Sequence, residues 1–230
     1  MRFAKNILVI FMGATVVACG GASSGSGSGG GGNVASGTAS QYFSKNAVGN
    51  TWTHIQTIIA YPNVGANETD ISSYKRTVTS STAGVITISD AHTSGTPPVT
   101  TTTSLTSHID ESGALVFSDG STLSIALPPS FAIGTTWVEK QATASLGSVN
   151  SKISAINVTR TVPAGTFNDC LQIDTTRSDP DGTKVSYSTF VSPSIGTTSV
   201  DFAAKVTYVA NGGGTFTVTR QLQPGFIANP

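Results

Sequence analysis

Short runs in which apolar and polar residues alternate follow one another along the chain after Ser40. Each run has about 5–10 residues, is rich in Val, Ile, Thr and aromatic residues, and ends near Gly, Pro, Asn or Asp, which is typical of β-strands joined by turns. No long run with a helical period of 3.6 residues interrupts the series. The predicted strands cover residues 52–61, 71–80, 84–89, 99–107, 115–117, 123–127, 137–146, 153–161, 170–176, 185–191, 200–209 and 216–222.

The alternation within single runs predicts the type of sheet. Phe216 and Val218 alternate with Thr215, Thr217 and Thr219, so one face of that strand is apolar and the other carries hydroxyls. One buried and one solvated face is the habit of antiparallel sheets. We therefore predict an all-β fold, with a single antiparallel domain over residues 41–230 built as a strongly curved sheet or open barrel of about 10–12 strands. A β-sandwich is the alternative.

A short motif recurs along the chain. The sequence VGNTW at residues 48–52 returns as IGTTW at 133–137, and IGTT at 195–198 resembles both. The first two copies lie too far apart for a solenoid, whose repeats span roughly 20–50 residues. The motif indicates either two similar β-meander halves in one sheet system or chance reuse of one kind of turn, and the second is the preferred interpretation.

The first 18 residues have the features of an export signal. Arg2 and Lys5 precede an apolar run at residues 7–17, which is shorter than the roughly 20 residues that a membrane-spanning helix needs. Small or branched residues lead directly to Cys19, and this arrangement resembles the lipobox of bacterial lipoproteins. The resemblance implies cleavage before Cys19 and attachment of diacylglycerol and palmitate to it. The alternative is an ordinary secretory signal in which Cys19 is incidental.

The segment that follows the cysteine predicts a tether. Residues 19–40 are mostly Gly, Ser, Ala and Thr, a composition that behaves as a flexible coil with a typical reach of roughly 25 Å. Gly20 stands where Asp is the usual cue for retention in the inner membrane of enterobacteria. By that resemblance, we expect the protein on the periplasmic face of the outer membrane, held by two or more acyl chains.

The charge composition excludes some partners. Charged residues make up only 10% of the chain, and without Arg2 and Lys5 the acidic side chains outnumber the basic ones by two. Lys and Arg do not cluster, so we expect no nucleic-acid partner and no electrostatic attraction to anionic lipid. With Cys19 acylated, Cys170 has no partner for an intrachain disulfide, and its apolar neighbours in an alternating run predict a buried thiol.

Two longer segments carry a family resemblance. Tyr42-Phe43, followed by VGNTW at 48–52, and the later segment VPAGTFNDC at 162–170 resemble a recurrent module of bacterial envelope lipoproteins. The resemblance spans most of residues 42–222 and implies a β-rich body. No activity or catalytic residue belongs to this module, so none is transferred. Some similar domains resemble the curved half-barrel of periplasmic lipoprotein carriers, which hold acyl chains on a concave face.

Candidate chemical groups are few. His108 and Asp110 would point to the same side of a strand and form the best metal-like pair, although turn-flanking polar residues are the preferred interpretation. The sequence DPDG at 179–182 resembles the start of a calcium loop but lacks the remaining ligands. Trp52 and Trp137 could stack on sugars, but we expect them to anchor the core or a strand end. We predict no catalytic residue, cofactor or metal.

Three functions remain open from the sequence. The first choice is a non-enzymatic envelope lipoprotein that acts as a binding or structural module. The second is a carrier that holds an apolar, acyl ligand on the concave face of a curved sheet. The third is a cell-surface hydrolase, which would need carboxylates from distant strands. A filled core would favour the structural module, an open apolar cavity above about 300 Å³ the carrier, and facing carboxylates the hydrolase.

The lipid anchor generates the first testable prediction. Metabolic labelling with a palmitate analogue should mark the wild-type chain and should not mark Cys19→Ser, because the sulfur is the acylation site. The variant should also be released into the soluble periplasm, since no basic patch holds the domain on lipid. Equal labelling of the two chains would contradict the lipobox interpretation.

Overall fold

The structure is a computed structural model that describes residues 36–43, 46–63, 65–120, 123–196, 198–209 and 212–225. These residues form an all-β domain with one short helix, α2 (Ala39–Phe43). Two short strands, β1 (Ser36–Thr38) and β8 (Ser130–Ala132), pair with each other beside the main sheet. The predicted signal peptide, Cys19 and most of the predicted linker lie outside the described residues. No described helix is long and apolar enough to cross a bilayer.

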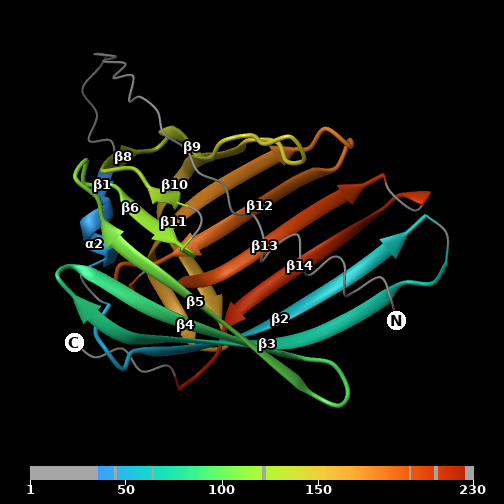
Figure 1. The fold of residues 1–230 in the computed structure, drawn as a ribbon, viewed down its shortest axis with the longest axis horizontal. Helices are drawn as coiled ribbons and strands as arrows, with labels where there is room; N and C mark the ends of the chain where they lie inside the picture. Colours follow the sequence, from blue (N-terminus) through green and yellow to red (C-terminus); the bar gives the residue numbers. More distant parts are fainter. Residues whose placement is uncertain are drawn as a thin grey trace.

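The main sheet contains twelve antiparallel strands and is nearly closed into a barrel (Figure 1). This confirms the predicted open barrel, because the strands form one continuous sheet rather than two stacked sheets. Their spatial order is β7-β6-β5-β4-β3-β2-β14-β13-β12-β11-β10-β9. Their bounds are β2 (Thr51–Pro62), β3 (Glu68–Thr82), β4 (Val85–Ser94), β5 (Val99–Ile109), β6 (Leu115–Ser118), β7 (Leu123–Leu127), β9 (Thr136–Lys140), β10 (Val149–Val162), β11 (Gly165–Ser178), β12 (Lys184–Val191), β13 (Ser199–Tyr208) and β14 (Gly214–Leu222).

The first and the last long strands of the chain, β2 and β14, pair with each other. β14 pairs with β2 over nine residue pairs, from Gly214 opposite Pro62 to Leu222 opposite His54. Directly opposed residues of an antiparallel pair share a face of the sheet. The buried Phe216 and Val218 therefore face the barrel interior together with their partners on β2, as the alternation predicts.

The opposite seam, between β7 and β9, has no ladder of backbone hydrogen bonds in the part of the chain that the structure describes. The two strands have only five residues each, but they lie next to one another. One side chain links them, because the indole Nε1 of Trp137 donates a hydrogen bond to the Ile125 carbonyl at 2.9 Å. The barrel is thus fully paired at one seam and bridged by a side chain at the other.

The repeated motif marks two halves of the barrel. Its first copy leads into β2 and its second into β9, and each of these strands opens a meander of six strands. The backbone contacts are duplicated as well. Gly49 N–H donates to Val78 O at 2.9 Å, and Gly134 N–H donates to Ile153 O at 2.8 Å. Both glycines have a positive φ, of 91° and 93°, which favours Gly over residues with a Cβ.

Three clusters of apolar side chains form the core. One gathers around Trp52, one around Leu171 and Phe131, and one around Val206 and Phe216. α2 packs against β5 and β6, where its buried Tyr42 joins the second cluster. Trp52 is fully buried, as expected for a core anchor.

The structure corrects the predicted elements at a few points. The strand predicted at residues 137–146 ends at Lys140, and a turn follows in which Thr143 Oγ1 accepts hydrogen bonds from the amides of Ser145 and Leu146. Strands β1 and β8 and helix α2 were not predicted, because three to five residues give too short a periodic signal.

Candidate ligand-binding cavity

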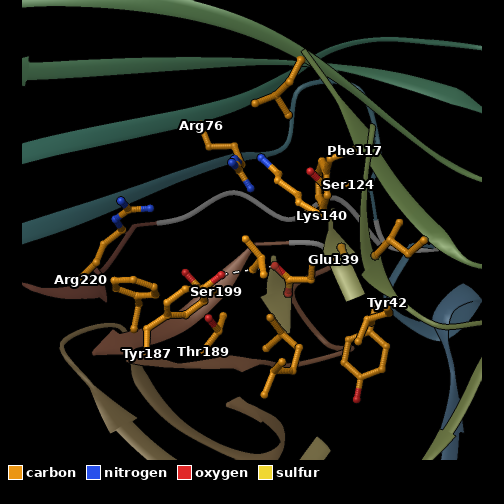
Figure 2. A pocket seen from close by; sticks show the side chains of 18 of the residues that line it. Tyr42, Arg76, Phe117, Ser124, Glu139, Lys140, Tyr187, Thr189, Ser199 and Arg220 are labelled. Atoms are coloured by element: carbon orange, nitrogen blue, oxygen red, sulfur yellow. Dashed lines mark hydrogen bonds between the residues drawn. The ribbon is translucent and has the colours of Figure 1, made fainter. Parts of the chain in front are cut away.

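The barrel interior is not completely filled by side chains. A cavity of about 430 Å³ lies inside it, lined by residues of α2 and of ten strands of the main sheet (Figure 2). A ring of eight strands is just wide enough for side chains to fill it or to hold one small ligand, and the diameter grows with strand number. A cavity is therefore expected in a ring of twelve strands.

Apolar side chains gather at one end of the cavity, and Figure 2 shows Ser124 and Lys140 beside Phe117. The apolar part of this wall consists of side chains from the second core cluster and of Phe117, which packs against that cluster. Tyr42 lies at this end (Figure 2), and burial raises the pKa of its phenol to about 12, so the group is neutral at physiological pH. The apolar residues of this wall are Leu115, Phe117, Leu127, Ile173 and Val191.

Arg220 lies at the opposite end of the cavity in Figure 2. It projects inward from β14, and its Nε and Nη2 both donate to the Oε1 atom of Gln56, at 3.2 and 2.8 Å. The guanidinium carbon also lies 4.4 Å from the centroid of the Tyr74 ring and 5.5 Å from that of Phe202. Burial and the positive charge of Arg76 lower the pKa of Arg220 from its usual value. The aromatic rings and Gln56 fix the orientation of this cation.

Two further arginines of the cavity wall are ion-paired. Arg76 on β3 donates through Nε and Nη2 to both carboxylate oxygens of Asp90 on β4, at 2.8 and 2.7 Å. Burial opposes ionisation of this carboxyl, but Arg76 outweighs it and lowers the pKa of Asp90. Arg177 donates through Nη2 to Asp179 Oδ2 at 2.9 Å. Each of these two charges therefore has a compensating neighbour.

Glu139 contributes the carboxylate of the cavity wall. Its Oε1 accepts a hydrogen bond from Ser151 Oγ at 2.8 Å, and its Oε2 accepts one from the Tyr187 hydroxyl at 3.3 Å (Figure 2). Burial raises the pKa of Glu139 above its usual range. Burial and the nearby Glu139 also raise the pKa of Tyr187, so this hydroxyl remains a donor.

Two histidines lie beside Arg220 in the barrel interior. The ring of His92 stacks on Tyr74 with centroids 4.2 Å apart, and burial lowers its pKa. His54 is only 3% exposed, and its Nε2 donates to the Ser199 carbonyl at 2.8 Å. Burial lowers the pKa of His54 to about 4, and Arg220 acts in the same direction. His54 is therefore neutral at neutral pH.

The residues that the sequence singled out for metal binding do not line this cavity, although Asp179 pairs with Arg177 of its wall. His108 is near the end of β5, and Asp110 follows that strand in a turn where its Oδ1 accepts hydrogen bonds from Ser112 and Ala114. Asp181 likewise accepts a hydrogen bond from the Thr183 amide within the turn between β11 and β12. The described residues contain no group of three or more His, Cys, Asp and Glu side chains arranged around a common point.

Cys170 is fully buried on β11 within the first core cluster, as predicted. Burial raises the pKa of its thiol to about 11, which disfavours the thiolate form. Trp137 is half-buried and bridges the seam, in agreement with the expectation that it anchors a strand end.

The polar cluster around Arg220 was not predicted from the sequence. Gln56 and Arg220 are 164 residues apart in the sequence, and only the pairing of β14 with β2 brings them together. A signal was nevertheless present. Every second residue of a strand lies on the same face. The apolar face of this strand therefore includes the arginine as well: its residues are Phe216, Val218, Arg220 and Leu222.

Comparisons with protein-family models, curated proteins and solved structures find no match for this chain.

The buried neutral His54 generates a prediction about stability. Its pKa in the folded protein, about 4, lies below the ordinary value of 6.5, so the unfolded chain binds the proton more readily between these values. The contribution of His54 to stability is therefore complete above pH 6.5 and is lost as the pH falls toward 4. The loss is on the order of 3 kcal/mol over this range.

Urea unfolding measured from pH 7.5 to 4 checks this expectation. His54→Gln keeps a donor for the Ser199 carbonyl but removes the titration, so its free energy of unfolding should fall less with decreasing pH. Identical pH profiles for wild type and His54→Gln would contradict the assignment.

Proposed function

We propose that this protein is an envelope lipoprotein that binds an apolar small molecule inside its barrel and acts as a carrier. The observation that carries the proposal is the interior cavity of about 430 Å³, whose wall combines Leu, Ile, Val and aromatic side chains with a few charged groups. Small-molecule sites are typically hollows of roughly 300–1,000 Å³, mostly apolar, with a few well-placed polar groups. This cavity matches that description in size and in composition.

The cavity favours the carrier over the other two functions derived from the sequence. A purely structural module gains stability from a close-packed interior, since cavities cost free energy. A hydrolase of the glycosidase type uses two carboxyl groups that flank the scissile bond. Among the described residues that line the cavity, Glu139 is the one carboxylate, and its oxygens accept hydrogen bonds from Ser151 and Tyr187.

The expected anchor is consistent with a carrier role. A lipid on Cys19 and a flexible segment with a reach of roughly 25 Å would keep the barrel close to the periplasmic face of the outer membrane. An apolar ligand that leaves a bilayer would then meet the barrel within the length of the tether. The resemblance to envelope lipoprotein modules supports the same location.

A titration with a neutral apolar fluorophore, N-phenyl-1-naphthylamine, tests the proposal. Its emission should increase and shift to the blue when it enters the cavity of the wild type, and it should saturate at one molecule per chain. Thr189→Phe places a ring in the cavity from β12 and should weaken binding about tenfold or more, since the ligand and the new ring compete for one space.

Ser186→Phe is the matched control, because Ser186 lies on the same strand but is exposed. It adds the same ring outside the barrel and should bind like the wild type. Circular dichroism verifies that both variants keep the β fold. Equal loss of binding in the two variants, or no saturable binding by the wild type, would refute the proposal.

A further inference from the structure

We infer that the ligand is an amphiphile with one anionic head group and that Arg220 binds this group inside the barrel. The inference rests on the proposed function, because it names the chemical class of the molecule in the same cavity. It concerns the head group, whereas the proposed function requires only an apolar body.

The charge environment of Arg220 differs from that of the other arginines in the described residues. Arg76 is paired with Asp90, Arg160 with Asp201, and Arg177 with Asp179. Arg220 has no carboxylate within ion-pair distance among the described residues. Its Nε and Nη2 donate instead to the neutral amide oxygen of Gln56. Arg220 is half-buried, and a cation partly removed from bulk water is stabilised when an anion compensates it.

The surroundings hold Arg220 ready for a ligand. Gln56 is 3% exposed and fixes one edge of the guanidinium, while the Tyr74 and Phe202 rings lie within cation–π distance of its carbon. Arg220 itself lines the cavity, and its Nη1 is not among the atoms that donate to Gln56. A pre-oriented planar guanidinium is the group that proteins use most often to recognise carboxylate and phosphate.

The arrangement of the cavity also gives the ligand a direction. Arg220 stands at one end and Tyr42 at the other, where the wall includes Leu115, Leu127 and their apolar neighbours (Figure 2). An acyl chain with its head on Arg220 would extend toward the Tyr42 end. Glu139 lies between these two ends in Figure 2, and its oxygens accept hydrogen bonds from Ser151 and Tyr187.

Displacement of N-phenyl-1-naphthylamine from the full chain at neutral pH tests the inference. The competitors share one twelve-carbon tail and differ in the head group: dodecanoic acid, dodecyl phosphate, methyl dodecanoate and dodecanol. The wild type should bind at least one of the two anions roughly tenfold to a hundredfold more tightly than the ester and the alcohol. The two anionic arms distinguish a carboxylate ligand from a phosphate ligand.

Three variants assign the preference to the arginine. Arg220→Gln should lose the preference for anions and keep its affinity for dodecanol. Gln56→Glu leaves the arginine in place but gives it a carboxylate partner at a position that it already contacts, and it should lose the preference as well. Lys205→Gln removes an exposed positive charge from β13 and should retain it.

The outcomes separate the two proposals. Displacement by all four compounds with equal affinity would overturn the role of Arg220 and leave the apolar carrier standing. Binding of neither the fluorophore nor any competitor would overturn the proposed function. Retention of the anion preference by both Arg220→Gln and Gln56→Glu would place the head-group site elsewhere. Gln56→Glu tests the role of Arg220 without removing the arginine. It therefore decides the question even if Arg220→Gln fails to fold.

Discussion

The pairing of β14 with β2 is the contact on which the rest of the structure depends. It joins the last strand of the chain to the first long one and converts two meanders into a ring of twelve strands. The number of strands sets the width of such a ring, and side chains fill a ring of eight but not a much wider one. The cavity is therefore a consequence of closure. The same pairing places Arg220 beside Gln56 and so builds the polar end of the cavity.

The two seams of the barrel are equivalent in position and different in structure. Each half begins with a copy of the glycine turn and contributes six strands, so the β7–β9 seam corresponds to the β14–β2 seam. The β14–β2 seam has nine residue pairs. The β7–β9 seam has short strands and the hydrogen bond from Trp137 to Ile125. The duplicated turn contacts favour two similar halves over chance reuse of a turn, the two alternatives that the sequence left open.

Much of the fold could be predicted from the sequence, because local alternation reports directly on strands. The alternation of Phe216 and Val218 with threonines indicated both the strand and its buried face. Helix α2 was beyond this approach, since five residues give no helical period. The cavity could not be predicted from local alternation either, because its existence depends on how many strands close the ring and not on any one segment. Arg220 could have been found by extending the alternating phase of its strand, but its partners required the pairing of distant strands.

We propose that the barrel interior holds an apolar ligand. Native mass spectrometry of Cys19→Ser, purified without detergent from the periplasm of its host, tests this directly, because the mass includes any molecule retained in the cavity. A carrier should give a population of the chain with one additional small molecule, released at higher collision energy and identifiable as a lipid-like amphiphile. A chain that carries no such molecule, and acquires none when incubated with host lipid extract, would contradict the carrier function.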